Sequence, residues 1–573
     1  MRRFLYTCIL SIVCVAVSMG TSRVDGAAGA KTNSALKHRW VYVMTNMLPD
    51  ASVATLDSLF GQAQAAGYNG VVLTDYKFTT PMSADPTYIA HARAVAQSAR
   101  SHGLEIIPMV CDIGYESGFE FQDPNLAEAL PVKDASYTVH RRAAEPDIDT
   151  GASLKNGDFE ESNGDHLSGW SYQDDPGTTT FVDHSVTHSG GQSLRTDKLG
   201  TGNPDGNARV IQTVNVVPFH AYHLSFWIKT EGFGTGWAAR VAVLPDQTKN
   251  DNLVFPSWSI ASTQDWKQYD AVFNSLGNTT VRVYLGTWGG RGGKIWWDSA
   301  KLEPAGFVNV ARRDGCPLTV TGDGGKVYHE GVDFDKITDP QLGVGGNYDV
   351  WHDAPKLSIP VGSSIKDGAH LRVSYYHVLR VEAGSVAPCL SEPKLYDLIQ
   401  AEVARVNDLF HPSTFFLGQD EIRAANWCAL CQSRHLTPGQ LLADNTRRCA
   451  GIIRKAAPKA TLVIWSDMYD PHHNAHDNYY LVNGTLAESW KGIDPAMIVA
   501  NWNNDKADKS LAWFAGLGNS QLLAGYYDGR PEAITSWLAA ARKAGPVDGV
   551  MYTTWQNDYS KLGAFAKAAW GSS

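Results

Sequence analysis

The chain has 573 residues, 43% of them hydrophobic and 19% charged, which is typical of a folded globular protein long enough for about three to four domains. Its formal net charge of −10 argues against a nucleic-acid partner, because such partners need a basic surface. The 18 tryptophans suit flat apolar ligands such as sugar rings, although they also suit ordinary β cores.

Residues 1–26 are predicted to be a secretory signal peptide. Arg2 and Arg3 precede an apolar run and a tail of small residues. A membrane anchor is the alternative, but the run is shorter than the ~20 residues that a span needs. No later stretch is long and apolar enough either, so we expect a secreted or periplasmic protein without a membrane span.

Residues 36–130 alternate short apolar runs with amphipathic segments. The runs at 39–44, 70–75 and 105–110 are separated by segments of helical length. Such a pattern is typical of parallel strands that are buried on both faces. We therefore assign this region to the first part of a barrel.

The pattern changes after a polar stretch at 140–157, which we interpret as a linker. Residues 154–305 show alternating strands separated by glycine-rich turns, which predicts an antiparallel β-sandwich. Residues 306–377 remain β-rich and are interpreted as a connecting segment. Within it, 370–377 is predicted to be an extra strand at the edge of the insertion.

Residues 378–573 resume the alternation of strands and helices. Five further strands follow an amphipathic segment, so three strands precede the insertion and five follow it. The predicted fold is α/β, a (β/α)8 TIM barrel interrupted after strand 3 by an all-β jelly-roll sandwich. The second part of the barrel should carry the catalytic residues.

Aromatic residues recur beside carboxylates or amides at the ends of these five strands, where such barrels hold their chemistry. Tryptophan stacks on the apolar face of a sugar while carboxylates and amides bind its hydroxyls, so the pattern favours a sugar pocket over ordinary rim packing. The residues concerned are Asp420, Glu421, Trp465, Asp467, Trp502, Asn503, Tyr526, Asp528, Trp555 and Asn557.

The stretch "SEPKLYDLIQAEVARVNDLFHPSTFFLGQDE", which ends in Asp420 and Glu421, resembles the helix and fourth strand of glycoside hydrolase family 20, the β-N-acetylhexosaminidases. The resemblance implies a substrate-assisted retaining mechanism. Glu421 would protonate the glycosidic oxygen and then activate water, and Asp420 would orient the 2-acetamido group of the substrate. Tyr526 would bind the acetamido oxygen, and the walls of the subsite would be Trp465, Trp502 and Trp555.

The sequence departs from the family pattern at positions where the family binds sugar hydroxyls. Asn557 occupies the place of a glutamate, and Met47 occupies the place of an arginine. Two alternatives therefore stay open. One is a glycosidase of the same barrel that acts on a non-acetamido sugar, and the other is a non-catalytic glycan-binding protein.

The predicted sandwich resembles carbohydrate-binding modules of the family 4/9 type. The resemblance rests on "NGDFE" at 156–160, "HSGGQSL" at 188–194 and "IWWDSAKLE" at 295–303. It implies a sugar-binding face and a possible structural calcium ion, whereas no cofactor is expected for catalysis. Candidates for the sugar face are Trp237, Trp258, Trp266, Trp288 and Trp296, although for each one taken singly a place in the core is favoured.

Two further motifs suggest metal ligands. Cys428 and Cys431 form a C-x-x-C, but no second such motif completes a zinc site, so we interpret them as disulfide-bonded or unpaired structural cysteines. The histidines of 470–476 lack helical ligand spacing and are interpreted as a solvated loop. We rank three other residues that follow predicted strands, Asp75, Tyr76 and Asp112, below the pair at the fourth strand.

Overall fold

The computed structural model describes residues 36–571 apart from 115–117, 347, 349–350, 383–385 and 546. The predicted signal peptide lies outside the described residues. Among those residues, no helix combines the length and the hydrophobicity that crossing a membrane would require.

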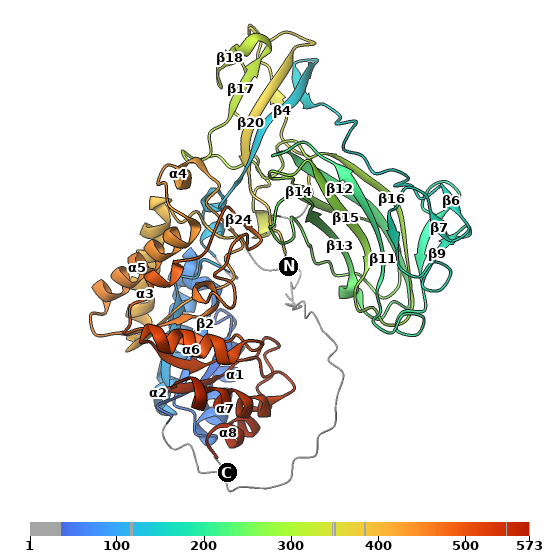
Figure 1. Ribbon diagram of the computed structural model, residues 1–573. Coiled ribbons are helices and arrows are strands. Elements are labelled where there is room, and N and C mark those ends of the chain that lie inside the picture. Colours follow the sequence, from blue (N-terminus) through green and yellow to red (C-terminus); the bar gives the residue numbers. More distant parts are fainter. Residues whose placement is uncertain are drawn as a thin grey trace.

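Eight parallel strands close into a barrel, drawn in blue and in orange to red in Figure 1. Strand β3 neighbours β21 although about 300 residues separate them in the chain. The eight strands and the interruption after the third are confirmed. Their bounds are β1 (His38–Met44), β2 (Gly70–Thr74), β3 (Glu105–Val110), β21 (Thr414–Leu417), β23 (Thr461–Trp465), β25 (Ile498–Asn501), β26 (Ser520–Leu523) and β27 (Gly549–Tyr552).

Helices occupy most of the connections between these strands. The connection between β23 and β25 differs, because it holds only the short 3-10 helices η8 (Asp467–Tyr469) and η9 (Ser489–Gly492) beside strand β24 (Leu481–Val482). The helical layer is therefore less regular than we predicted. The helices are α1 (Ala51–Ala65), α2 (Pro86–Ser101), α3 (Pro393–Phe410), α4 (Ala429–Gln432), α5 (Pro438–Ala456), α6 (Ala507–Leu517), α7 (Ile534–Ala544) and α8 (Leu562–Trp570).

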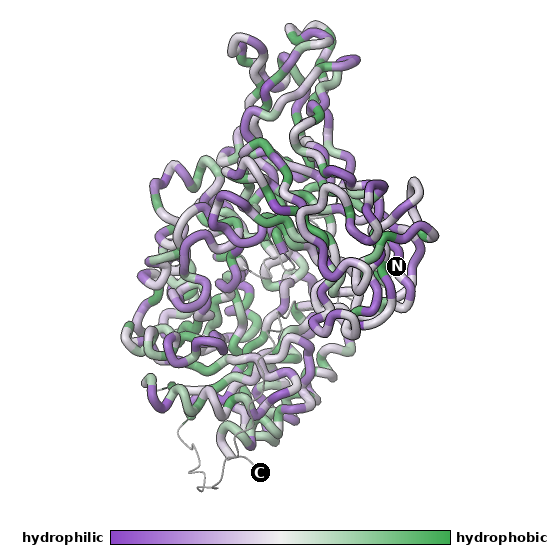
Figure 2. The backbone as a smooth tube through the Cα atoms, turned by 45° about the vertical axis from the view of Figure 1, so that its right-hand side comes forward, coloured by the Kyte–Doolittle hydropathy of each residue, from purple (hydrophilic) through white to green (hydrophobic). Residues whose placement is uncertain are grey.

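The barrel has an apolar interior and an apolar outer layer, which explains why its strands are apolar on both faces. Tyr42, Phe416 and Trp465 lie in the interior cluster, whereas Phe415 and Leu417 of the same strand as Phe416 face the surrounding helices. In Figure 2 the hydrophobic segments run through the middle of the body, and many hydrophilic segments lie at its periphery.

Residues 180–304 contribute most of two antiparallel sheets, drawn in green in Figure 1. The alternating burial along β11 places Val210, Gln212 and Val214 inward, as expected for a two-layer sandwich. One sheet is β14 (Gln264–Asn274), β12 (Ala221–Glu231), β16 (Lys294–Pro304), β10 (Ser193–Thr196) and β9 (Thr180–Asp183); the other is β13 (Ala239–Pro245), β15 (Thr280–Thr287), β11 (Ala208–Asn215) and β8 (Tyr172–Gln173).

A third sheet corrects one prediction and confirms another. The predicted polar linker begins at the last residue of β4 (Leu130–His140) and contains β5 (Ala143–Pro146). The predicted extra strand at 370–377 is β20 (His370–His377), which lies in this sheet between β4 and β17 (Thr319–Gly322). The sheet closes with β18 (Val327–Tyr328) and β19 (Leu357–Ser358). The apolar residues of this sheet form a separate core. The pairing of its strands was not predictable, because local sequence pattern does not show which distant segments pair.

Candidate functional site

Acidic residues from three neighbouring strands meet at the C-terminal edge of the barrel. Asp112 follows β3, Asp420 and Glu421 follow β21, and Asp467 follows β23. Strand β21 pairs with β3 on one side and with β23 on the other. Because the strands are parallel, their C-terminal ends lie at one edge, which is where barrels of this architecture carry chemistry.

The chain after β21 is pressed against the chain after β3. The N–H of Ile113 donates to the carbonyl oxygen of Gly418 at 2.9 Å. A Cβ atom on Gly114 would lie 1.5 Å from the carbonyl oxygen of Asp420, so only glycine fits at position 114. Glu421 has a φ of 48°, a left-handed conformation that costs energy in a residue with a side chain. The fold thus imposes the backbone position of the two acids.

Asp467 is the centre of the hydrogen bonds at this edge. Its Oδ2 accepts the backbone N–H of Glu421 and the side-chain amide of Asn474, each at 2.9 Å. Its Oδ1 accepts the indole N–H of Trp502 at 3.3 Å. The side chain is fully buried. This carboxylate therefore fixes the catalytic candidate of one strand and the tryptophan of another.

The electrostatic environment favours protonated carboxyls. Burial raises the pKa of Asp420 well above its ordinary range, and the charge of Asp467 contributes next. Burial also raises the pKa of Asp467 to about 6, although its hydrogen bonds act in the opposite direction. The pKa of Glu421 is raised by burial, while nearby Arg423 lowers it. Crowded carboxylates cannot all ionise together, so burial and mutual repulsion both oppose full ionisation of the cluster.

Arg423 balances part of this negative charge. Its guanidinium lies 3.0 Å from Oε2 of Glu421 and 5.2 Å from the ring centroid of Tyr480. The Tyr480 hydroxyl in turn donates to Glu382 at 2.6 Å. The charge of Glu382 also raises the pKa of Glu421. Glu382 lies where the chain returns from the insertion to the barrel, and it therefore contributes to the electrostatic environment of Glu421.

The remaining strand ends form a second polar group. The backbone N–H of Trp555 donates to Oδ2 of Asp528 at 2.7 Å, and the hydroxyl of Thr554 donates to the other carboxylate oxygen. Tyr526 is half-buried and its hydroxyl accepts from Gln556 at 3.4 Å. Asn557 is exposed and accepts from Tyr559. Asp528 therefore holds Trp555 in place, and its role toward a ligand stays a prediction.

The three predicted wall tryptophans differ in exposure. Trp465 is 2% exposed and packs against Phe416, Tyr42 and Trp555 in the barrel interior. Trp502 and Trp555 are half-buried. Trp465 thus supports the aromatic layer, and the other two expose surface that a sugar ring could contact.

Sequence reasoning ranked low or missed several residues of this cluster. Asp112 acts on the pKa of Asp420, and Asn474 bonds Asp467. His473, which we assigned to a solvated loop, lies with its ring 4.4 Å from that of Trp502. The position after β3 was the available signal for Asp112, whereas Asn474 and His473 lie in an irregular loop. The three histidines of this loop form no metal-ligand group among the described residues.

Asp75, in contrast, is engaged in structural contacts. Its Oδ2 accepts the N–H of Met47 at 2.8 Å and the hydroxyl of Tyr88 at 3.1 Å. Lys77 lies 3.4 Å from the other oxygen, and both members of this ion pair are buried. Asp75 therefore organises the loops after β1 and β2.

The predicted sugar-face tryptophans of the sandwich are distributed over both sheets. Trp296 is 2% exposed and donates to Asp183, so it offers almost no surface to a ligand. Trp258 packs on Phe226 and Tyr269. Trp237 is 40% exposed.

A row of aromatic residues lies on the outer face of the four-stranded sheet. Tyr172 is opposite Ile211, and Ile211 is opposite Tyr284 in the strand register. Trp288 lies 6.4 Å from Tyr284, and the guanidinium of Arg209 lies 5.8 Å from the Trp288 ring centroid. This face offers the stacking surfaces that sugar rings use.

The carboxylates in the motifs that imply calcium already have partners. Glu160 accepts backbone N–H groups of Gly191 and Gln192, and Asp298 accepts those of His188 and Ser189. Among the described residues, neither Glu160 nor Asp298 belongs to a group of three or more His, Cys, Asp or Glu side chains that could hold a metal ion. These oxygens hold the 188–192 loop, and the structural calcium ion stays a prediction.

The sandwich contacts the loop beside the acidic cluster. The side-chain amide of Asn250 donates to the carbonyl oxygen of Tyr480 at 2.8 Å, and Asp251 accepts the N–H of Tyr480. A cavity of 580 Å³ lies at this contact, between residues 244–252 and 474–480. Asn474, which bonds Asp467, is among its lining residues. The cavity connects the sandwich with the surroundings of the acidic cluster.

The comparisons with known proteins concern the sandwich. A family model described as "Carbohydrate binding domain" matches residues 151–298, so the chain contains a domain of this type. The structure described as "CBM4 structure and function" is 17% identical, with 26% of this chain and 99% of that chain covered and a TM-score of 0.20. No curated protein matches the chain.

Two further solved structures are similar at the same level of identity. One is TmCBM61 in complex with beta-1,4-galactotriose, with 17% identity, 26% of this chain and 97% of that chain covered, and a TM-score of 0.20. The other is the CBM22-1 xylan-binding domain from Paenibacillus barcinonensis Xyn10C, with 17% identity, 28% and 94% covered, and a TM-score of 0.20.

Proposed function

We propose that the protein is an exported glycoside hydrolase that cleaves β-linked N-acetylhexosamine by a substrate-assisted retaining mechanism. Its catalytic unit is the parallel barrel, interpreted as a (β/α)8 barrel. The observation that carries the proposal is the position of Glu421, a carboxyl with a raised pKa in a cluster of carboxylates at the C-terminal edge. A general acid at neutral pH needs such an environment.

Glu421 acts first as the acid. Its raised pKa keeps a proton available for the glycosidic oxygen as the bond to the leaving group breaks. Arg423, 3.0 Å from the carboxyl, stabilises the anion that remains. The same anion then takes a proton from water as that water attacks the anomeric carbon and displaces the substrate's acetamido oxygen, which had bonded there in the first step. The two steps return Glu421 to its starting state.

The acidic cluster stabilises the positive charge that develops on the sugar. In the proposed mechanism the acetamido oxygen of the substrate attacks the anomeric carbon, which leaves a positive charge on the acetamido group. Asp420 orients this group. The negative charges of Asp467 and Asp112, which raise the pKa of Asp420, also favour a positive charge on the acetamido group. A poorly hydrated cluster of this kind favours a cationic transition state over a neutral ground state.

The aromatic residues position the ring. Trp502 follows β25 and Trp555 follows β27, and both indoles are half-buried. Tyr526 follows β26 between them and would bind the acetamido oxygen. The indole of Trp502 is held by Asp467, which also holds the backbone of Glu421. Sugar binding and acid placement therefore depend on one carboxylate.

The sandwich supports the carbohydrate substrate class. The match of residues 151–298 to a carbohydrate-binding family favours a domain that holds a glycan while the barrel hydrolyses it. A polysaccharide bound to the sandwich raises the local concentration of chain ends at the barrel. Because this match concerns glycan binding and not hydrolysis, a non-catalytic glycan-binding protein is the second candidate.

The test compares aryl β-N-acetylglucosaminide, aryl β-N-acetylgalactosaminide and aryl β-glucoside as substrates. The variants are Glu421→Gln and Asp420→Asn, with the exposed Glu532→Gln as the control. We expect hydrolysis of the acetamido substrates only, and a loss of about 10²–10⁴-fold in kcat for Glu421→Gln. Hydrolysis of the plain glucoside at an equal rate would replace the proposal by a non-acetamido glycosidase. Glycan binding without turnover would replace it by a binding protein.

A further inference from the structure

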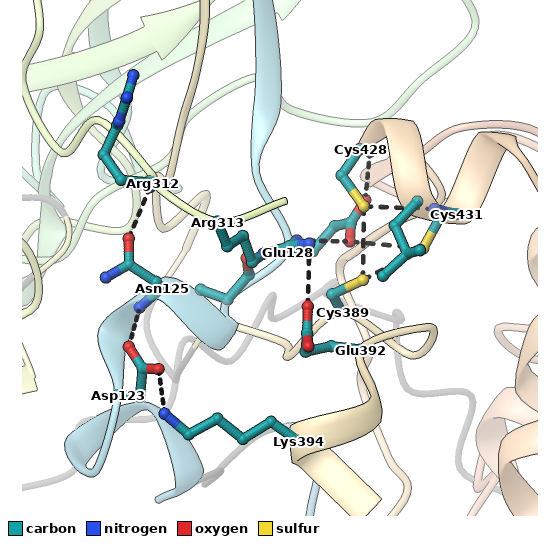
Figure 3. Close-up of polar contacts among 12 residues, drawn as sticks. Asp123, Asn125, Glu128, Arg312, Arg313, Cys389, Glu392, Lys394, Cys428 and Cys431 are labelled. Carbon is teal, nitrogen blue, oxygen red and sulfur yellow. Dashed lines mark hydrogen bonds and ion pairs between the residues drawn. The ribbon is translucent and has the colours of Figure 1, made fainter. Parts of the chain in front are cut away.

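Four potential metal ligands from separate parts of the chain lie together outside the barrel site. They are the side chains of Glu128, Cys389, Cys428 and Cys431, all buried (Figure 3). One ligand atom from each lies within 4.8 Å of all the others. The structure thus adds a third sulfur, that of Cys389, and a fourth ligand, Glu128, to the C-x-x-C motif. The sequence spacing did not show either of them.

The spacing of the sulfur atoms distinguishes a metal site from a disulfide. The Sγ of Cys389 is 3.4 Å from the Sγ of Cys428 and 3.4 Å from that of Cys431. A disulfide bond measures about 2.05 Å. Zinc–thiolate bonds of about 2.3 Å in tetrahedral geometry separate neighbouring sulfurs by roughly 3.8 Å. One sulfur 3.4 Å from each of two others, with all three within 4.8 Å of one another, fits a shared central ion better than one bonded pair.

We propose that Glu128, Cys389, Cys428 and Cys431 hold a structural zinc ion. Three thiolates and one carboxylate are a donor set that zinc accepts, and a closed set of four protein ligands is the hallmark of a structural site. The site lies apart from the proposed catalytic residues and does not depend on their function.

Glu128 is oriented by its neighbours as a single-oxygen ligand. Its Oε1 accepts the backbone N–H groups of Trp427 and Cys428 at 2.6 and 2.9 Å. Its Oε2 faces the Sγ of Cys431 at 3.8 Å. Contacts of this kind outside the ligand shell fix the direction of a metal-binding carboxylate.

Arg313 supplies charge compensation. Its guanidinium lies 3.9 Å from Oε2 of Glu128 and 3.7 Å from Glu392, and its side chain is 9% exposed. Three thiolates and a carboxylate carry four negative charges, of which zinc cancels two. A buried arginine beside the ligands offsets part of the remainder.

The position of the site suggests what the ion stabilises. Glu128 lies two residues before the start of β4, where the chain leaves the barrel for the insertion, and Cys389 lies four residues before the start of α3, where it returns. Cys428 and Cys431 flank the start of α4, a few residues after Glu421. One ion would fasten the exit, the return and the loop that follows the catalytic candidate.

The test measures metal content directly in the mature full-length protein. Protein purified without chelators is analysed for zinc, and the chelator-stripped, reduced protein is titrated with Zn²⁺ and with Co²⁺ alone. We expect one zinc per chain, and a cobalt form that shows thiolate-to-cobalt charge transfer and tetrahedral d–d absorption. Cys389→Ser and Cys428→Ser should lose the ion, whereas the buried Cys449→Ser, outside the cluster, should keep it.

Two outcomes would overturn the proposal. One is a disulfide from Cys389 to Cys428 or Cys431, found by non-reducing peptide mapping of metal-free protein as purified. The other is a folded, reduced protein whose thiols bind no Zn²⁺ at micromolar concentration. Because Glu128→Gln removes the anionic oxygen and leaves all sulfurs, weaker zinc binding in that variant supports the fourth ligand, and unchanged binding rejects it.

Discussion

The backbone N–H of Glu421 donates a hydrogen bond to Oδ2 of Asp467 at 2.9 Å, and this bond joins the ends of two neighbouring barrel strands. It fixes the proposed acid at its main chain, so the carboxyl of Glu421 stays free to pair with Arg423. The charge of Asp467 also raises the pKa of Glu421. Asp467 therefore controls both the position and the protonation of the acid.

Replacing Asp467 by asparagine should shift the pH dependence of hydrolysis. The change removes a negative charge that raises the pKa of Glu421, so that pKa falls. Activity requires protonated Glu421, and the basic limb of the kcat/KM profile should move to lower pH. The measurement is kcat/KM against pH for Asp467→Asn and the wild type.

The same substitution also leaves donors without acceptors. Glu421, Asn474 and Trp502 all donate to Asp467, and an amide has only one acceptor oxygen. We expect a loss of about 1–3 kcal/mol in the free energy of unfolding. A basic limb that stays in place in a folded Asp467→Asn variant would contradict the role given to its charge.

Arg423→Met should move the same limb in the opposite direction. The guanidinium lowers the pKa of Glu421, so its removal raises that pKa and extends activity to higher pH. The maximal rate should fall, because the anion of Glu421 loses its counter-ion. Arg423→Lys serves as the charge-retaining control and should leave the limb near its original position. Equal profiles for the methionine and lysine variants would show that Arg423 acts through packing alone.

The barrel was predictable because its strands are apolar on both faces and alternate with helices. The runs at 39–44, 70–75 and 105–110 correspond to β1, β2 and β3 within one or two residues. The six-stranded sheet was not predictable, since β4 and β20 pair across more than 200 residues. Local pattern shows that a segment is a strand but does not show its partner.

The site was predictable where a strand end supplies the residue. Asp420, Glu421, Asp467 and Trp502 converge because parallel strands end at one edge. Loop residues such as Asn474 required the structure. The sulfur cluster shows the same limit, because Cys389 is far from the C-x-x-C in sequence and Glu128 is still farther.

Glu402→Gln should stabilise the protein at neutral and higher pH. Glu402 is fully buried in α3, and burial raises its pKa to about 8, even though its Oε2 accepts the N–H of Cys111 at 3.0 Å. In the unfolded chain its pKa is near 4.5. Between pH 4.5 and pH 8 the unfolded chain has lost this proton while the folded protein still holds it. The free energy of unfolding therefore falls as pH rises from about 4.5 to 8.

The size of the effect follows from that shift. A difference of this size costs roughly 5 kcal/mol above pH 8 and almost nothing below pH 4.5. Glutamine keeps the acceptor for Cys111 and cannot ionise. The difference in unfolding free energy between Glu402→Gln and the wild type, measured at pH 5 and pH 8, should grow with pH. Exposed Glu532→Gln is the control, and a pH-independent difference for Glu402→Gln would refute the buried ionisation.

Trp288→Ala should weaken glycan binding by the sandwich without changing turnover of small substrates. Trp288 lies beside Tyr284 and Arg209 on the outer face of the four-stranded sheet, where a sugar ring can stack. Loss of one stacking surface should weaken binding about tenfold, equivalent to about 1.4 kcal/mol. Binding to insoluble polysaccharide is measured by depletion, with aryl glycoside hydrolysis measured in parallel. Trp266→Ala, in β14 of the other sheet, is the matched control. If only the control variant loses binding, the glycan lies on the five-stranded sheet instead.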